Sequence, residues 1–258
     1  MLQIISLMDS LLKQVNLDFK FTAYKVLAFS KDDGMLEFVN GSKTVQDVLK
    51  ENNNKIENFL KGLATTKIPQ HGKEPPMESF DEAKFDEILD TYIKSCAGYC
   101  TVTYFLALGD RHLENLMIDN MGHLFHIDFG FIFGKNPGGK TLYQPPIRIC
   151  KEMVEAMGGN QHPHYETFKK KCVESFLYLR NYQRLILNLF HLMIHAGIKD
   201  LPFGEHERLL SSMHDKFMPT KNNIEAEKEF LSIIKESVNA MFVQIYEKFH
   251  VWAQYMKK

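Results

Sequence analysis

Two short polar stretches contain the side chains whose chemistry is most distinctive. Gly109-Asp110-Arg111-His112-Leu113-Glu114-Asn115 supplies two candidate proton acceptors, Asp110 and His112, and one candidate metal ligand, Asn115. His126-Ile127-Asp128-Phe129-Gly130 supplies a carboxylate, Asp128, thirteen positions after Asn115. Phosphoryl transfer by kinases needs a group that handles the hydroxyl proton, together with an Asn and an Asp that hold Mg²⁺ against the phosphates. The pair of stretches therefore predicts phosphoryl-transfer chemistry, which neither stretch indicates alone.

Asp110 and His112 compete for the role of general base. An imidazole titrates near neutral pH, so we favour His112 as the base. Asp110 would be an essential partner that orients His112 or the attacking hydroxyl, and the sequence leaves this assignment open. The order Asp-Arg-His, in place of His-Arg-Asp, points away from ordinary protein kinases. We expect Arg111 to be structural, pairing with a carboxylate or a backbone carbonyl, and His126 to be a hydrogen-bonded core histidine.

Asn115 and Asp128 are the predicted metal ligands. A carboxylate in an Asp-Phe-Gly turn after an apolar strand binds a hard cation through oxygen, and Asn115 would add a neutral oxygen to the same ion. Taken alone, Asn115 would be interpreted as a turn-capping amide. Together with Asp128, it predicts a site for Mg²⁺ or Mn²⁺.

Composition and charge limit the class of protein. The 258 residues, 45% of them hydrophobic, suffice for one large domain or two small ones with a real core. A net charge of −1 provides no global attraction for nucleic acid or anionic lipid, so we expect no nucleic-acid partner and only local attraction to a membrane. The four cysteines form no Cys-x-x-Cys pair, and we expect them to be buried, reduced thiols of a cytosolic protein.

The elements that must position these residues follow from periodicity and turn signals. Two hairpins are predicted, one from strands 21–29 and 35–39 around an Asp-Gly tip, the other from strands 115–118 and 123–127 beside the polar stretches. A capping box at Ser79 and Glu82 should open a helix that reaches about residue 108. Other helices are predicted at 2–15 (an apolar stripe from Ile4 to Val15), 44–60, 151–157, 165–196, 204–214 and 225–256, with loops over 61–79 and 131–150.

This order of elements predicts an α+β, mainly α, fold. A helical body with a small β-hairpin that carries the polar loop is the layout of the C-lobe of a protein-kinase-like fold. Residues 1–40 would be the end of an N-lobe and the hinge, and residues 41–258 the C-lobe. Within the C-lobe we expect a catalytic loop at 109–115, an activation loop at 128–150 and a C-terminal helix at about 225–256.

Over nearly its whole length the chain resembles the catalytic domain of the phosphatidylinositol 3-/4-kinase superfamily, and within it the class III phosphatidylinositol 3-kinases of vacuolar sorting and autophagy. The resemblance rests on residues 2–9, 24–28, 94–100, 109–130, 151–159 and 253–255. It implies ATP and Mg²⁺ or Mn²⁺ as cofactors, and transfer of the γ-phosphate to the 3-hydroxyl of phosphatidylinositol for endosomal sorting and autophagy. It also implies a cytoplasmic protein, peripheral on endosomal and autophagic membranes, with a pseudokinase-like scaffold and a beclin-type regulatory subunit.

The resemblance also implies roles for individual residues. His112 and Asp110 take the catalytic-loop roles, and Asn115 and Asp128 the metal roles. The hinge that contacts adenine through its backbone would be formed by Glu37, Phe38 and Val39. The adenine pocket would be walled by Tyr24, Leu36, Met117 and Ile127, positions that core packing alone would also explain.

Two features depart from the class III pattern. The chain begins where the family's αC-like helix is already under way, without a phosphate-binding loop or an ATP-binding lysine before it. We therefore expect a fragment that phosphorylates lipid more slowly than a full enzyme, or a truncated kinase-like binding module without activity. The activation loop is slightly longer than the class III pattern, and its stretch 134–140 is partly similar to phosphatidylinositol 4-kinases, so a 4-kinase is the alternative. A protein kinase of the phosphatidylinositol-kinase-related group is a more remote one.

The predicted activation loop suggests which headgroup is bound. Its cations, Lys135, Lys140 and Arg148, are spread out, whereas a phosphorylated headgroup would call for a dense basic block. We predict that they contact unphosphorylated phosphatidylinositol, and the alternative is an ordinary solvated loop.

The last residues mix Phe249, Trp252, Tyr255 and Met256 with lysines, which suits a membrane interface. The alternative is a helix packed on the kinase core, and the resemblance implies both states in turn.

Deletion of residues 247–258 is expected to reduce lipid phosphorylation on vesicles more than basal ATP hydrolysis, because only the first reaction needs the membrane. Both rates are measured on the same preparations. An equal loss of the two would contradict membrane contact.

Overall fold

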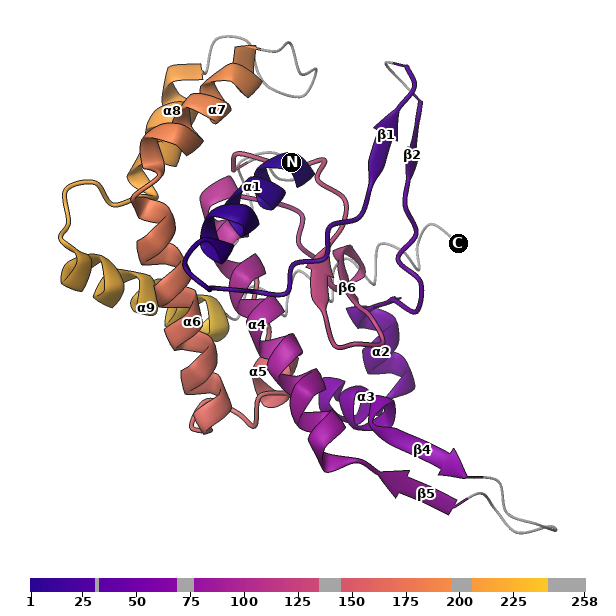
Figure 1. Cartoon of the computed structure of the whole chain (residues 1–258). Helices are drawn as coiled ribbons and strands as arrows, with labels where there is room; N and C mark the ends of the chain where they lie inside the picture. The colour runs from indigo at the N-terminus through magenta and orange to yellow at the C-terminus, as the bar shows by residue number, and fades with distance from the viewer. Residues whose placement is uncertain (31–32, 69–76, 135–144, 196–205, 241–258) are drawn as a thin grey trace.

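The computed structural model describes residues 1–30, 33–68, 77–134, 145–195 and 206–240 (Figure 1). Within these ranges the chain is mainly helical with three small antiparallel sheets, which confirms the predicted fold class. Lys135 and Lys140, which are predicted to contact the headgroup, lie outside the described ranges, as do residues 241–258 with the end of the predicted C-terminal helix.

The helices have the following bounds: α1 (Leu2–Lys13), α2 (Val45–Glu51), α3 (Ile56–Leu63), α4 (Glu82–Leu106), the short 3₁₀ helix η1 (Leu113–Asn115), α5 (Lys151–Glu155), α6 (Pro163–Arg180), α7 (Gln183–His195), α8 (His206–Asp215) and α9 (Asn223–Asn239). The strands form the pair β1 (Val26–Ala28) and β2 (Gly34–Leu36), the pair β4 (Thr65–Ile68) and β5 (Met77–Phe80), and a three-stranded sheet of β3 (Lys43–Thr44), β6 (Leu116–Ile118) and β7 (Leu124–His126) in the order β3-β6-β7.

Helix α4 is the central element and packs against α3, α6 and β7 (Figure 1). Every residue from Ser95 to Leu106 is buried, as expected for a helix surrounded on all sides. The helix ends at Ala107, whose left-handed backbone (φ 44°) turns the chain toward the first polar stretch. The end of α4 therefore fixes where that stretch begins.

The β6–β7 hairpin is held against α4 by its turn. Asp119 accepts hydrogen bonds from the backbone N–H groups of Met121 and His123, both at 2.9 Å, and its second carboxylate oxygen lies 2.9 Å from His123 Nδ1. Gly122 has a φ of +86°, and a Cβ there would lie 2.6 Å from the Ile88 carbonyl oxygen of α4. A larger residue would push the turn away from α4.

Stacked aromatic rings join the C-terminal end of α4 to α6, to α9 and to the segment that follows α8. Phe105 stacks on Phe217 at 4.5 Å between centroids and on Phe176 of α6 at 5.5 Å. Phe176 in turn stacks on Phe230 of α9 at 4.1 Å. These rings are fully buried, so they anchor α4 close to the polar stretch that follows it.

Several predicted elements differ in the structure. The 44–60 helix is two helices, because Asn53 and Asn54 have left-handed backbones (φ 56° and 59°) that end α2. The predicted 61–79 loop contains the β4–β5 hairpin. Ser79 lies in β5, and the side chain of Asp81 caps α4 instead by accepting from the Lys84 N–H at 3.0 Å.

The predicted 165–196 helix is divided into α6 and α7. Arg180 points out of α6 and donates to the backbone carbonyls of Phe217 (2.8 Å) and Met218 (3.0 Å). The next N–H groups, of Asn181 and Tyr182, bond three residues back, which tightens the chain into a turn.

The apolar stripe of α1 is buried as predicted except for Val15, which lies beyond the helix and is 42% exposed.

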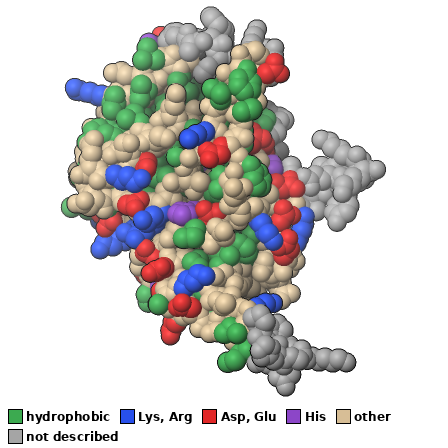
Figure 2. Space-filling view, turned by 45° about the vertical axis from the view of Figure 1, so that its right-hand side comes forward, with side chains coloured by type: hydrophobic (Ala, Val, Ile, Leu, Met, Phe, Trp, Pro, Cys, Tyr) green, Lys and Arg blue, Asp and Glu red, His purple; other side chains and the backbone are tan. Residues whose placement is uncertain are grey.

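The predicted burial of the four cysteines is confirmed, because all are buried and free of disulfides. Burial raises the pKa of each thiol, to about 12 for Cys150. The surface mixes Lys and Arg with Asp and Glu on the face that Figure 2 shows. Among the described helices, none has the length and apolar character that crossing a membrane would require.

Replacement of Asp119 by Asn is expected to lower the free energy of unfolding at pH 7 by about 1–2 kcal/mol, because the charged acceptor is lost. Burial alone would raise the pKa of Asp119, but the bond with His123 and the backbone donors outweigh it and hold this pKa below its usual value. The stabilisation is therefore complete above about pH 4 and disappears as the pH falls through the lowered pKa. Urea unfolding of both proteins at several pH values measures this, with the exposed Asp86→Asn as control. A stability difference that persists unchanged at pH 3 would contradict the assignment.

Candidate active site

The Arg111 side chain joins the two polar stretches. Its Nε donates to the Gly109 carbonyl and its Nη1 to the Ile127 carbonyl, both at 2.7 Å, and its Nη2 donates to the Asp128 carbonyl. The residue is only 5% exposed, and its guanidinium lies 6.0 Å from the centre of the Phe129 ring. The predicted structural role of Arg111 is confirmed, with backbone carbonyls as its partners.

Backbone hydrogen bonds also join the end of α4 and the first polar stretch to the residues that follow the second stretch. The Gly109 N–H donates to the Phe131 carbonyl at 2.9 Å. The N–H groups of Phe133 and Gly134 donate to the carbonyls at the end of α4, those of Leu106 (3.1 Å) and Ala107 (2.8 Å). The two stretches therefore run side by side, held by backbone contacts for which the sequence contains no signal.

His112 lies between two carboxylates. Its Nε2 is 4.0 Å from Asp110 Oδ2 and its Nδ1 is 3.9 Å from Glu114 Oε2. Glu114 is fixed in turn, because Gln46 of α2 donates to its other oxygen at 2.8 Å. The sequence interpretation missed Glu114, although an acid two positions after a candidate base was a usable signal. The structure thus brings Asp110 and His112 together and adds a second acid.

Asn115 belongs to the first polar stretch and Asp128 to the second, and Arg111 connects the two stretches. The Asn115 side-chain amide donates to the Asp110 carbonyl at 2.8 Å, and the Asn115 carbonyl accepts from the Ile127 N–H at 3.1 Å. Asp128 is exposed, with one carboxylate oxygen accepting from the Gly130 N–H at 3.1 Å. Asp110 and Asp128 both have left-handed backbones, with φ of 53° and 56°.

These side chains fit a hard divalent cation. Asn115 uses its amide nitrogen, and not its amide oxygen, in the bond to Asp110, and Asp128 is an exposed residue with one carboxylate oxygen bonded to the Gly130 N–H. Among the described residues there is no group of three His, Cys, Asp or Glu side chains that would form a closed protein cage. Mg²⁺ bound by one carboxylate, one amide oxygen, water and substrate phosphates needs no such cage.

The seven residues predicted to contact adenine fall into two groups. Tyr24, Met117 and Ile127 lie at the core beside the polar stretches, and Tyr24 Oη donates to the His126 carbonyl at 3.2 Å. Burial raises the pKa of Tyr24 to about 12, although the Arg111 charge lowers it, and Asp128 adds a smaller increase. Of the others, Val39 packs partly on the core, whereas Leu36, Glu37 and Phe38 are exposed.

One residue of the predicted hinge, Glu37, is hydrogen-bonded next to the β1–β2 hairpin. The Glu37 N–H donates to the Lys25 carbonyl at 2.8 Å, and the Glu37 carboxylate accepts from the Lys25 N–H at 2.8 Å. Leu36 is 62% exposed and Phe38 is 72% exposed, so both lie open on this hairpin. The adenine contacts of all seven residues stay predictions.

His126 and Arg148 are buried behind the site. His126 is 1% exposed and stacks on Tyr99 at 5.1 Å between ring centres, which confirms a core position. The predicted side-chain hydrogen bond is not seen at Nδ1, which is buried without a partner in the described part of the chain. Burial lowers the His126 pKa well below its usual value, and the charges of Arg111 and Arg148 lower it further. Arg148 itself is 7% exposed, so its predicted headgroup contact would require the side chain to leave this environment.

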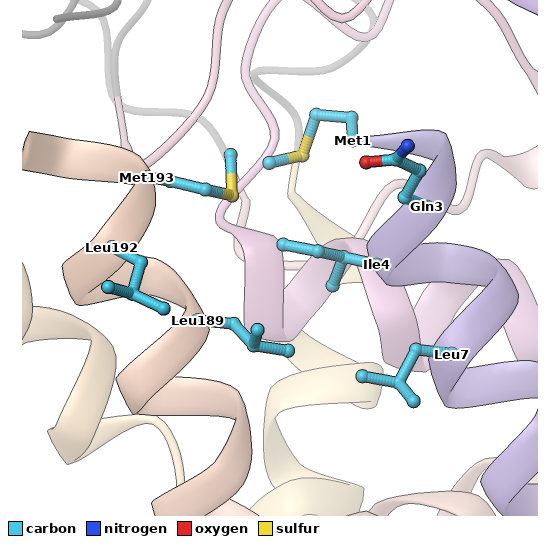
Figure 3. A pocket seen from close by; sticks show the side chains of 7 residues that line it. All are labelled: Met1, Gln3, Ile4, Leu7, Leu189, Leu192 and Met193. Carbon is cyan, nitrogen blue, oxygen red and sulfur yellow. The ribbon is translucent and has the colours of Figure 1, made fainter. Parts of the chain in front are cut away.

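A cavity of about 570 Å³ between α1 and α7 is distinct from this site (Figure 3). Its lining consists of Met1, Gln3, Ile4, Leu7, Leu189, Leu192 and Met193. The lining is apolar apart from Gln3 and includes none of the predicted site residues.

A helical lobe in which an Asp-Arg-His loop is bonded to an Asp-Phe-Gly turn defines the class of kinase catalytic domains. The chain matches the family described as "Phosphatidylinositol 3- and 4-kinase" over residues 1–203, and it belongs to this family.

Several curated proteins are similar over almost the whole chain. "Phosphatidylinositol 3-kinase, nodule isoform" of Glycine max is 42% identical over 258 residues, covering 99% of this chain and 29% of that protein. "Phosphatidylinositol 3-kinase VPS34" of Arabidopsis thaliana is 42% identical over 255 residues, with the same coverage of 99% and 29%. The Saccharomyces cerevisiae protein of that name is 34% identical, covering 99% of this chain and 27% of its own. The chain thus spans less than a third of the length of these relatives.

Replacement of Arg111 by Lys is expected to lower the free energy of unfolding by about 2–4 kcal/mol, because an ammonium group does not reproduce the planar fork and leaves buried carbonyls unpaired. Urea unfolding measures the change, with Arg184→Lys on the exposed surface of α7 as the matched control. Equal stability losses in the two variants would show that Arg111 does not join the stretches.

Proposed function

We propose that this chain is the catalytic lobe of a phosphatidylinositol 3-kinase, which transfers the γ-phosphate of ATP to the 3-hydroxyl of phosphatidylinositol. The observation that carries the proposal is the hydrogen-bonded network in which Arg111 and Asn115 hold the backbones of Asp110, His112 and Asp128 together. Membership of a family of 3- and 4-kinases supports lipid phosphorylation, and the relatives named as 3-kinases support the 3-hydroxyl. Residues 1–40 would be the N-lobe end and hinge, and residues 41–258 the C-lobe.

His112 acts as the general base in this proposal. Its imidazole accepts the proton of the inositol hydroxyl while the oxygen attacks the γ-phosphorus and ADP leaves. The ring becomes positively charged in this step, and the carboxylates of Asp110 and Glu114, at 4.0 and 3.9 Å, stabilise that charge. Asp110 is the positioning partner, because its backbone carbonyl also binds the Asn115 amide.

Asn115 and Asp128 would hold Mg²⁺ or Mn²⁺, which when bound neutralises the negative charge of the phosphates. Tyr24, Met117 and Ile127 would form the inner wall of the adenine site, with Leu36, Glu37, Phe38 and Val39 on its outer side. The headgroup would meet Lys135, Lys140 and Arg148. By similarity to the class III enzymes, we also propose a cytoplasmic protein on endosomal and autophagic membranes with regulatory subunits.

A phosphatidylinositol 4-kinase is the second candidate, because the matched family contains both activities. The two differ in which hydroxyl receives the phosphate, so headgroup analysis of the labelled product separates them. A kinase-like binding module would bind nucleotide without forming labelled lipid.

The purified chain is incubated with phosphatidylinositol vesicles, Mg²⁺ or Mn²⁺ and radiolabelled ATP. We expect phosphatidylinositol 3-phosphate as product, and a fall in kcat of about 10²–10⁴-fold for His112→Gln with little change in KM for ATP, because the base acts in the transition state. Asp128→Asn should lose activity and require more Mg²⁺.

His164→Gln, at a half-buried position in the first turn of α6, is the matched control and should keep the parental rate. Full activity in His112→Gln would remove His112 as the base. A product phosphorylated at another hydroxyl would replace the proposed activity with the second candidate.

A further inference from the structure

Gln46 lies outside the two polar stretches but is hydrogen-bonded to the first of them. It is the second residue of α2, and its side-chain Nε2 donates to Glu114 Oε1 at 2.8 Å. The two residues are 68 positions apart, so only the folded chain brings them together. What Gln46 contributes therefore depends on what Glu114 does beside His112.

Helix α2 gives Gln46 a rigid support next to the first polar stretch. The side chain of Thr44 caps the helix, and Val45 and Val48 are fully buried. Thr44 is also paired with Met117 in the β3–β6 ladder, and β6 continues directly from the first polar stretch. The beginning of α2 is thus tied to the chain segment that it contacts, which fixes the position of Gln46.

The second carboxylate oxygen of Glu114 faces the candidate base. Oε2 lies 3.9 Å from His112 Nδ1, which is too long for a hydrogen bond but within the range where a carboxylate stabilises a charged imidazole. A glutamate side chain has several alternative rotamers, and holding it in one of them costs conformational entropy. Because Gln46 binds Oε1, the other oxygen is kept near the His112 ring.

The donor that holds Glu114 is a neutral amide. A lysine at this place would form an ion pair and offset the negative charge of the carboxylate, whereas an amide leaves that charge unchanged. Lys43, two positions before the helix, forms its ion pair with Glu51 at the other end of α2. Gln46 therefore positions the Glu114 carboxylate without neutralising it.

We propose that Gln46 is a positioning residue for phosphoryl transfer, which holds Glu114 where it stabilises the imidazolium that forms on His112. This inference rests on the proposed function of His112 as the base. The imidazole takes the proton of the inositol hydroxyl, the hydroxyl oxygen bonds to the γ-phosphorus, and the bond from that phosphorus to ADP breaks. The charge on Glu114 matters most when the ring is charged, so Gln46 should affect kcat more than KM.

The kinetic test compares Gln46→Leu, Glu114→Gln and the double variant on phosphatidylinositol vesicles with Mg²⁺ and labelled ATP. We expect kcat to fall about threefold to tenfold for Gln46→Leu and about tenfold for Glu114→Gln, with KM for ATP unchanged. The double variant should be no slower than Glu114→Gln, because Gln46 acts through Glu114. Gln161→Leu, the same replacement at an exposed position before α6, is the matched control and should keep the parental kcat.

Gln46→Lys separates a positioned charge from a simple connection between α2 and the first polar stretch. The ammonium group still donates to Glu114 but offsets its charge, so kcat should fall as it does in Gln46→Leu. A parental kcat in Gln46→Lys would overturn the proposal, since a donor of any charge would then be sufficient.

A second measurement requires no lipid phosphorylation, which keeps this inference separate from the proposed function. Chains labelled with ¹⁵N-histidine are compared by NMR at about pH 8.5, where an ordinary imidazole is neutral, and His112→Gln identifies the His112 signals. Gln46→Leu and Glu114→Gln should shift the His112 Nδ1 resonance in the same direction, and the double variant should match Glu114→Gln. Gln161→Leu should leave this resonance in place.

Unchanged His112 signals in both single variants would overturn the proposal, as would losses of kcat that multiply in the double variant. If no labelled lipid forms, the proposed function fails, and the NMR comparison alone decides whether Gln46 positions Glu114 beside His112.

Discussion

The candidate active site depends on the binding of one buried guanidinium to three backbone carbonyls. Asp110 and His112 come from the loop after α4, whereas Asp128 follows β7, and Arg111 is the side chain that binds both segments. Arginine suits this task because its planar donors reach several acceptors at once without losing charge. Displacement of Arg111 would loosen the stretch that carries His112 and Asn115 from the stretch that carries Asp128, so the chemistry depends on a residue that takes no part in it.

The rest of the lobe holds this arrangement in place. Helix α4 provides a buried axis, the turn at Asp119 and Gly122 holds the β6–β7 hairpin against it, and stacked rings fix its C-terminal end to α6 and α9. The side chain of Ser95 in α4 accepts from the Leu124 N–H of β7 at 2.9 Å, which sets the hairpin relative to the helix. Reactive side chains on short loops are thus supported from behind by rigid elements.

Much of the site was predictable because it depends on residue type and spacing. The strands around residues 115–127, the buried stripe of α1 and the structural role of Arg111 are local or follow from hydrogen-bonding capacity. The predictions failed where contacts between residues far apart in the sequence, or distances known only from the structure, determine the outcome. Arg180, the last residue of α6, binds carbonyls 37 and 38 residues away, and the distance from Glu114 to His112 is known only from the structure. Similarly, alternation alone did not show that Leu36 and Phe38 are exposed.

The left-handed backbones of Asp110 and Asp128 affect how mutagenesis of this site is interpreted. Asparagine tolerates that conformation nearly as well as aspartate, whereas alanine does not. An alanine scan would therefore combine two effects at these positions, a missing carboxylate and a distorted main chain, and would overstate the catalytic importance of both acids. Isosteric amide replacements separate the two effects, which makes them the informative choice for this family of loops.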